Sequence, residues 1–175
     1  MATSCQVVRH VRLLFLCALL FAATSAIARE QWVEGRVVFV NDGDTAVVDV
    51  GGRSLRVRFY GIDAPERQNR DWPAQPYSRK AADFMRELLG KREVRVRLTG
   101  ERTHAREVGE VFVAGQSASR AIVREGLAWW NDKFAAGDRE LERLQAEARQ
   151  ARRGLWRDPS PVPPWVHRAR HRRAH

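Results

Sequence analysis

Alternating apolar and polar residues predict a group of β-strands between residues 33 and 59. β-Branched residues are concentrated there, and Asp42-Gly43 and Gly51-Gly52 have the composition of tight turns, so three strands joined by hairpins are expected. In the third strand, three apolar residues alternate with Arg56, Arg58 and Tyr60. The alternation places the apolar residues on one face and Arg58 on the other, toward solvent or a substrate.

The same kind of pattern predicts two further strands and three helices after this region. A polar loop with prolines spans 67–76, and Ser117 is a candidate N-cap. The strands are expected at 93–98 and 108–113, and the helices at 78–89, 117–125 and 138–153. This order predicts an α+β fold, a five-stranded OB-fold β-barrel with about three packed helices, although other small α+β domains share it.

The first 28 residues have the pattern of a secretory signal peptide. Its parts are a basic start at Arg9, His10 and Arg12, an apolar run at 13–23 and a small-residue cleavage site at Ala26-Ile27-Ala28. The apolar run is shorter than the ~20 residues that a membrane-spanning helix needs. A cleaved leader is therefore favoured over an uncleaved membrane anchor, and we expect the protein to be exported, either periplasmic or secreted.

Composition limits what the exported part can be. Cys5 and Cys17 both lie in the leader, so the mature chain has no disulfide and depends on its hydrophobic core. Its length suits one domain, expected over 29–156, and we expect a monomer without a membrane anchor. The net charge of the whole chain is +10, and loss of Arg9 and Arg12 lowers it to +8. A basic exported domain favours polyanions, whether nucleic acid, acidic polysaccharide or anionic lipid.

Residues 157–175 have the composition of a linker followed by a basic tail. Prolines recur up to Pro164, and arginines and histidines follow, which predicts a disordered segment. His167, His171 and His175 recur every four residues, as ligands on a helix would, but arginines surround them. A solvated tail that adds nonspecific affinity for nucleic acid is favoured over a metal site.

Acidic residues are concentrated in two turns that flank the strand carrying Arg58. One turn reads Asp42-Gly43-Asp44-Thr45 and the other Gly61-Ile62-Asp63-Ala64-Pro65-Glu66. Aspartate is common in turns for structural reasons, but clustered carboxylates repel one another unless a cation or an arginine offsets them. Together with Arg58 and Arg106, the turns suggest a site for a metal and a phosphate. Oxygen ligands favour Ca²⁺ or Mg²⁺ over zinc, for which the core offers only His104.

The order of these motifs resembles the staphylococcal nuclease (thermonuclease) family. The matching segments lie between 33 and 156, at 42–45, 58–66, 106, 108–111, 123–130 and 154–156. The resemblance implies an OB-fold nuclease that depends on Ca²⁺ rather than Mg²⁺, acts on DNA and RNA and leaves 3′-phosphate ends. It also implies a role for each residue. Asp44, Asp63 and the carbonyl of Ala64 would hold calcium, Glu66 would act as general base or orient water, and Arg58 and Arg106 would bind the phosphate.

The sequence departs from the family pattern in two places. Around the second arginine the family usually has Asp-x-Tyr-Gly-Arg, and this chain has Arg102-Thr103-His104-Ala105-Arg106. His104 therefore takes the position of the substrate-contacting tyrosine and is the candidate substrate-binding residue. Asn131 replaces the aromatic residue that usually follows the pair Trp129 and Trp130. These tryptophans could stack on bases, but a place in the core is favoured.

Two other functions remain open on the sequence alone. The first is a catalytically inactive OB-fold module that binds nucleic acid or another polyanion, and the second is an exported module for acidic polysaccharide. The presence of all five side chains with implied roles favours the enzyme. Chelation of calcium distinguishes them, because it stops degradation of DNA by a nuclease, whereas a binding module degrades none.

Overall fold

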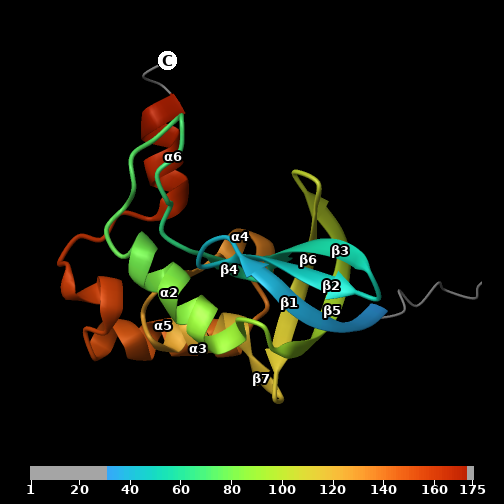
Figure 1. Cartoon of the computed structure of the whole chain (residues 1–175). Coiled ribbons are helices and arrows are strands. Elements are labelled where there is room, and N and C mark those ends of the chain that lie inside the picture. Colours follow the sequence, from blue (N-terminus) through green and yellow to red (C-terminus); the bar gives the residue numbers. More distant parts are fainter. Residues whose placement is uncertain (1–30, 173–175) are drawn as a thin grey trace, which may run out of the picture.

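A closed five-stranded β-barrel forms one half of the structure, a computed structural model that describes residues 31–172 (Figure 1). Its sheet contains β1 (Gln31–Val40), β2 (Thr45–Val50), β3 (Arg53–Phe59), β5 (Glu93–Thr103), β6 (Arg106–Val113) and the short β7 (Gln116–Ser117). The strand order is β3-β2-β1-β5-β6-β7, and β3 also pairs in parallel with β6, which closes the barrel. The predicted α+β class and five-stranded barrel are confirmed.

The closure of the barrel fixes where Arg58 lies. The β2–β3 hairpin turns at Gly51 and Gly52, whose φ angles of 60° and 85° match the left-handed backbone of a tight hairpin. In this register Arg58 lies opposite Thr45 of β2, and on its other side it is aligned with Val108 of β6. The arginine is therefore held between two strands at the seam of the barrel.

The helices lie toward one end of the barrel, and the last of them stands away from it (Figure 1). They are α2 (Ser78–Leu89), α3 (Ala118–Arg124), α4 (Asp132–Ala135), α5 (Arg139–Gln150), the 3₁₀ helix η1 (Gly154–Arg157) and α6 (Pro164–Arg172). The three predicted helices correspond to α2, α3 and α5, and α4, η1 and α6 were not foreseen. Ser117 caps α3 by accepting a hydrogen bond from Arg120 N, as predicted, and Asp138 caps α5 through Leu141 N.

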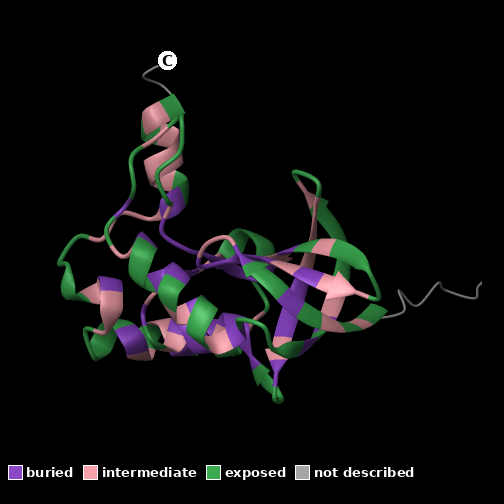
Figure 2. Cartoon of the chain, in the orientation of Figure 1, coloured by how far each residue is buried: buried purple, intermediate pink, exposed green. Residues whose placement is uncertain are grey.

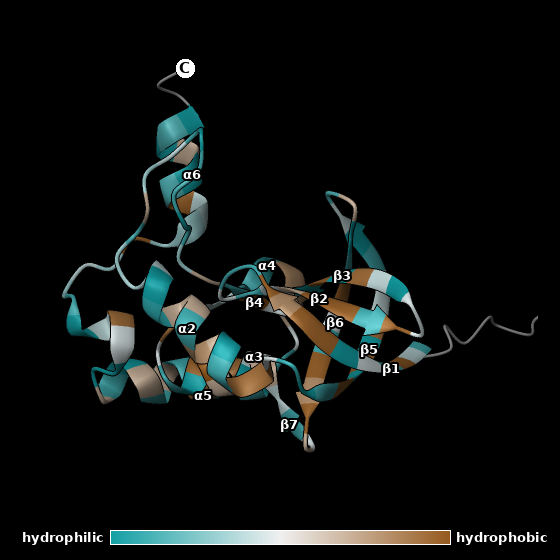
Figure 3. Ribbon diagram, viewed as in Figure 1, coloured by the Kyte–Doolittle hydropathy of each residue, from teal (hydrophilic) through white to brown (hydrophobic). Residues whose placement is uncertain are grey.

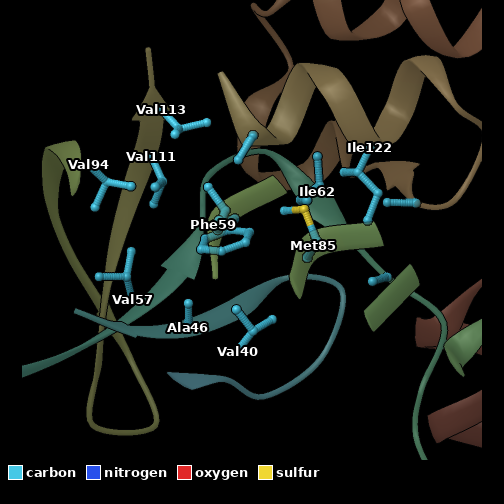
Figure 4. Close-up of a cluster of buried hydrophobic side chains, with 14 of the residues drawn as sticks. Val40, Ala46, Val57, Phe59, Ile62, Met85, Val94, Val111, Val113 and Ile122 are labelled. Atoms are coloured by element: carbon cyan, nitrogen blue, oxygen red, sulfur yellow. The ribbon is translucent and has the colours of Figure 1, made fainter. Parts of the chain in front are cut away.

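One hydrophobic core joins the barrel to these helices. Val57 and Phe59 of β3 point into the barrel, and Met85 of α2 and Ile122 of α3 close its end (Figure 4). Figure 2 shows the buried stretches running through the strands and recurring along the helices, while Figure 3 shows that α6 is largely hydrophilic. Alternation along β3 thus buries one face and leaves Arg58 on the other, as predicted.

A second, two-stranded sheet lies beside the barrel. It pairs β4 (Ile62–Asp63) with β8 (Trp129–Trp130), so that Asp63 lies opposite Trp129. Trp129 is buried, with its ring edge-on to Trp156 at 5.6 Å between centroids, and Trp130 Nε1 donates to Ala135 O at 3.0 Å. Both tryptophans are used in packing, so the prediction that favoured the core over base stacking is confirmed.

The tail is where the structure corrects the sequence prediction. Residues 157–175 were expected to be disordered, yet Pro164–Arg172 form α6, which stands beside the 67–76 loop (Figure 1). A proline fits the first turn of a helix because its missing N–H needs no partner there, and Pro164 is buried. The predicted signal peptide lies outside the described residues. No helix within 31–172 is long and apolar enough to cross a membrane.

Candidate active site

Asp44 lies in the β1–β2 turn, where the chain leaves the barrel and returns. Its N–H donates to Asp42 Oδ1 at 3.1 Å, the local turn that aspartates form, and its carbonyl accepts from Phe59 N at 2.8 Å. The carboxylate is buried and accepts hydrogen bonds from Thr45 Oγ1 at 3.1 Å and from Ala64 N at 2.7 Å. The first acidic turn is therefore bonded directly to the second.

The second acidic turn begins at a glycine that no other residue can replace without strain. Gly61 has a φ of 72°, and a Cβ there would lie 2.6 Å from Leu141 Cδ1 of α5. This turn directs the chain into β4, where the side chain of Asp63 is fully buried beside that of Asp44. The glycine thus fixes how Asp63 enters the site.

Arg58 joins the two buried aspartates. Its Nη1 donates to Asp44 Oδ1 at 2.5 Å and its Nη2 to Asp63 Oδ1 at 2.6 Å. Burial alone would lower the pKa of Arg58, but the two carboxylates outweigh it and raise the pKa. Burial raises the pKa of Asp44 well above its ordinary value, and Arg58 acts against that shift. The guanidinium of Arg58 thus bridges the two desolvated carboxyl groups.

Glu66 follows β4 and is positioned by the loop rather than by a strand. Its N–H donates to Gln75 Oε1 at 2.9 Å, and its carbonyl accepts from Gln75 N at 2.8 Å. These bonds fix the backbone, while the carboxylate projects into the site and keeps 20% of its side-chain surface exposed. Solvent can therefore reach Glu66, in contrast to Asp63.

Arg106 begins β6 and is held loosely. Its Nε donates to Thr103 O and its Nη1 to Thr45 Oγ1, both at 3.3 Å, so much of its donor capacity is available to a ligand. Burial, followed by the nearby Arg58 charge, lowers the pKa of Arg106. Before it, His104 and Ala105 form the tip of the β5–β6 hairpin with φ angles of 49° and 58°. Both positions need a left-handed backbone, and the usual glycine would suit the second one.

One cavity of about 440 Å³ brings the predicted residues together. All of them line it: Asp44, Arg58, Asp63, Ala64, Glu66, His104 and Arg106. The lining residues that were missed in the sequence include Trp72 of the loop, Phe134 of α4 and Arg168 of α6. Trp72 and Phe134 stand alone in polar segments, and Arg168 is one arginine among many, so the pattern gave no signal for them.

The donor atoms at this cavity suit a hard cation. The carboxylates of Asp44 and Asp63 lie close enough together for both to bond the guanidinium of Arg58. Oxygen donors favour Ca²⁺ or Mg²⁺. Within residues 31–172, no three or more His, Cys, Asp or Glu side chains group as a metal site. Any cation would therefore rely on two aspartates, with backbone oxygens such as that of Ala64 and water.

The chain was compared with known proteins. The family model described as staphylococcal nuclease homologue matches residues 56–158. An uncharacterized endonuclease of Escherichia coli O157:H7 is 39% identical over 139 residues, which cover 79% of this chain and 86% of that protein. The micrococcal nuclease of Shigella flexneri is 30% identical over 162 residues, which cover 86% of this chain and 90% of that protein. The thermonuclease of Staphylococcus hyicus is 28% identical over 126 residues, which cover 69% of this chain and 74% of that protein. The chain therefore belongs to the staphylococcal nuclease family and is a nuclease, an enzyme that hydrolyses phosphodiester bonds.

Proposed function

We propose that the protein is an exported, calcium-dependent nuclease that cleaves DNA and RNA and leaves 3′-phosphate ends. The observation that carries this proposal is the convergence of two buried aspartates, a glutamate and two arginines on one cavity. Nucleases of this family depend on a metal, and the oxygen donors described above fit calcium. The second arginine and the glutamate then face the space where a phosphodiester would lie.

Each side chain has a task that follows from its position. Arg106, with most of its donors unused, binds the non-bridging oxygens of the scissile phosphate through its planar guanidinium. Arg58 approaches the same phosphate from the barrel seam, while Asp44, Asp63 and the carbonyl of Ala64 hold the cation. His104, at the hairpin tip on the cavity wall, contacts the substrate beyond the phosphate.

Glu66 is the base in this scheme because it is the solvent-accessible carboxylate of the three. It accepts a proton from a water molecule whose oxygen attacks phosphorus, the bond from phosphorus to O5′ breaks, and the departing O5′ takes up a proton from solvent. The products are a 5′-hydroxyl on one fragment and a 3′-phosphate on the other. General base catalysis accelerates a reaction by only ~10²- to 10⁴-fold. Stabilisation of the negative charge on the phosphoryl oxygens must therefore supply most of the rate acceleration.

The cation would supply part of that stabilisation, as positive charge beside the phosphoryl oxygens. The arginines supply the rest. Arg58 is placed between two strands and Arg106 begins β6 beside the tip of the β5–β6 hairpin, so both guanidinium groups line the cavity where a phosphate would lie. This arrangement favours enzymatic cleavage over mere binding of nucleic acid.

Digestion of defined substrates tests the proposal. The purified protein is incubated with single- and double-stranded DNA and RNA in the presence of Ca²⁺, Mg²⁺ or a chelator. We expect degradation of all four with Ca²⁺, little with Mg²⁺ and none with chelator. Fragments should accept phosphate from a kinase at their 5′ ends without prior dephosphorylation. Degradation that continues in chelator, or fragments with 5′-phosphates, would contradict the proposed chemistry.

Export and the monomeric state are proposals with separate measurements. Expression of the full-length gene should place a protein in the periplasm or medium whose first residue is Arg29, as N-terminal sequencing would show. Size-exclusion chromatography with light scattering should give the mass of one mature chain. A cytoplasmic protein that starts at Met1 would contradict the assignment of a signal peptide.

A further inference from the structure

Helix α6 brings an additional arginine to the acidic residues of the active site. Arg168 Nη2 donates to Asp63 Oδ2 at 2.7 Å, and Nη1 donates to Asp63 Oδ1 at 3.2 Å and to Glu66 Oε1. The Arg168 side chain keeps 24% of its surface exposed, whereas that of Asp63 keeps none. An arginine near the end of the chain is therefore paired with a buried aspartate and with the proposed base.

The segment that carries Arg168 is docked by specific contacts. His167 Nε2 makes a hydrogen bond with Pro73 O at 3.0 Å, and Gln75 Nε2 donates to Val162 O at 2.9 Å. Gln75 is the same residue whose Oε1 accepts from Glu66 N. Gln75 thus links the segment that leads into α6 to the backbone of Glu66, and His167 links the helix itself to the 67–76 loop, so the placement of Arg168 in the cavity is built into the fold.

The contacts of Arg168 use the oxygen lone pairs that a cation needs. Both oxygens of Asp63 accept from guanidinium groups, Oδ1 from Arg58 and Arg168 and Oδ2 from Arg168. A cation at Asp63 and a proton at Glu66 would each require an oxygen that Arg168 holds. Arg58 is fixed between two strands, whereas Arg168 lies on a helix at the end of the chain, so Arg168 is the group that can withdraw.

We propose that α6 is an autoinhibitory latch, in which Arg168 acts as an internal counter-ion that competes with the catalytic cation for Asp63 and blocks Glu66. The inference rests on the proposed cation site. Binding of the cation displaces Arg168, and α6 separates from the 67–76 loop. An enzyme of this kind is restrained where the cation is scarce and becomes active where it is abundant.

Cation affinity tests the latch without any use of activity. Titration calorimetry with CaCl₂ is performed on protein purified after expression of the full-length gene, as wild type, Arg168→Gln and Arg170→Gln. Arg170 is exposed on the same helix, so its variant controls for the loss of one positive charge. We expect Arg168→Gln to bind Ca²⁺ about fivefold more tightly, because one partly exposed ion pair no longer has to break, and Arg170→Gln to stay within about twofold of wild type.

Hydrogen exchange gives the second readout. In the wild type, Ca²⁺ should accelerate exchange of the amides of 164–172, because the helix loses its anchor. In Arg168→Gln these amides should exchange fast with or without Ca²⁺. Equal Ca²⁺ affinity in wild type and Arg168→Gln, weaker binding by Arg168→Gln, or exchange in the wild type that Ca²⁺ leaves unchanged would each overturn the latch.

The outcomes separate the latch from the proposed function. If Arg168→Gln binds Ca²⁺ more tightly but no variant cleaves nucleic acid in a Ca²⁺-dependent way, the latch stands and the proposed function fails. If the wild type cleaves only with Ca²⁺ and both variants bind it like the wild type, the latch alone fails. If no variant binds Ca²⁺, both fail. Lower activity of Arg168→Gln at unchanged Ca²⁺ affinity would instead assign Arg168 to the substrate and overturn the latch.

Discussion

The two arginines assigned to the phosphate differ in what they do for the folded protein. Arg58 pairs with two buried carboxylates, whereas Arg106 makes two hydrogen bonds of 3.3 Å with other residues of the described range 31–172. The loss of one partner of a buried ion pair leaves an uncompensated charge and is strongly destabilising. Activity alone therefore cannot compare these residues, and stability must be measured with it.

Substitution of Arg106 by alanine should affect catalysis and spare stability. We expect Arg106→Ala to lower turnover about a hundredfold, the effect of removing one donor to developing charge, and to change the free energy of unfolding by less than about 1 kcal/mol. Arg58→Ala should lower turnover as much and also cost about 3–5 kcal/mol of stability. Steady-state kinetics and urea denaturation check both. Near-normal turnover of Arg106→Ala would contradict its role at the phosphate.

Ala105 is a residue whose backbone conformation suits glycine better. Its φ of 58° costs an L-residue roughly 1–2 kcal/mol in the folded state, and a glycine would avoid that cost. Part of the gain is lost, because glycine is more flexible than alanine in the unfolded chain. Ala105→Gly should therefore stabilise the protein by about 1 kcal/mol in urea denaturation, and Ala114→Gly, at a φ of 47° in the β6–β7 turn, should do the same far from the site. As a control, Ala136→Gly, at a φ of −57°, should lose stability. A loss in all three would contradict the strain argument.

At the scale of elements, a buried ionic network joins the barrel to the helices. Glu110 of β6 is almost inaccessible and accepts hydrogen bonds from Arg97 of β5, Ser117 and Arg120 of α3. Arg120 in turn pairs with Asp138 and Glu140 at the start of α5. The network lies away from the catalytic cavity, so its contribution is to the packing of α3 and α5 on the barrel.

Removal of the central carboxylate should therefore reduce stability without changing the chemistry. We expect Glu110→Ala to cost about 1–3 kcal/mol, because Arg97, Ser117 and Arg120 each lose a hydrogen-bond acceptor while Arg120 keeps its pairs with Asp138 and Glu140, and to leave turnover per folded molecule unchanged. Glu140→Gln removes a charge from the same arginine at an exposed position and should cost less than about 1 kcal/mol. Thermal and urea unfolding give both values. Similar losses in the two variants would show that burial of Glu110 is not the cause.

At the scale of the whole molecule, local patterns predicted most of the longer elements, and motifs predicted residues that line one cavity. The helix at 78–89 and the cap at Ser117 depend on neighbouring residues, so periodicity was sufficient to find them. The parallel pairing that sets Arg58 beside Val108 depends on segments distant in sequence, and no local pattern encodes it. Arg168 was missed for the same reason. A proline- and arginine-rich tail has one composition whether it is free or docked, and the bonds that dock it involve Pro73 and Gln75.

The positive charge of the whole molecule leads to a prediction about salt. Binding of single-stranded DNA releases counterions, so the logarithm of the binding constant falls with the logarithm of the salt concentration, with a slope of about −0.7 for each phosphate contacted. We therefore expect the affinity for single-stranded DNA in Ca²⁺ to fall by on the order of tenfold between about 50 and 200 mM NaCl. Arg56 is exposed on β3, close enough to lower the pKa of Arg106, and Arg56→Gln should reduce the slope by about 0.7. Arg53→Gln, at the far end of the same strand, should leave it unchanged. Fluorescence anisotropy with a labelled, cleavage-resistant oligonucleotide measures these slopes. Equal slopes in both variants would mean that the nucleic acid responds to the net charge of the protein and does not contact Arg56 on its way past Arg106.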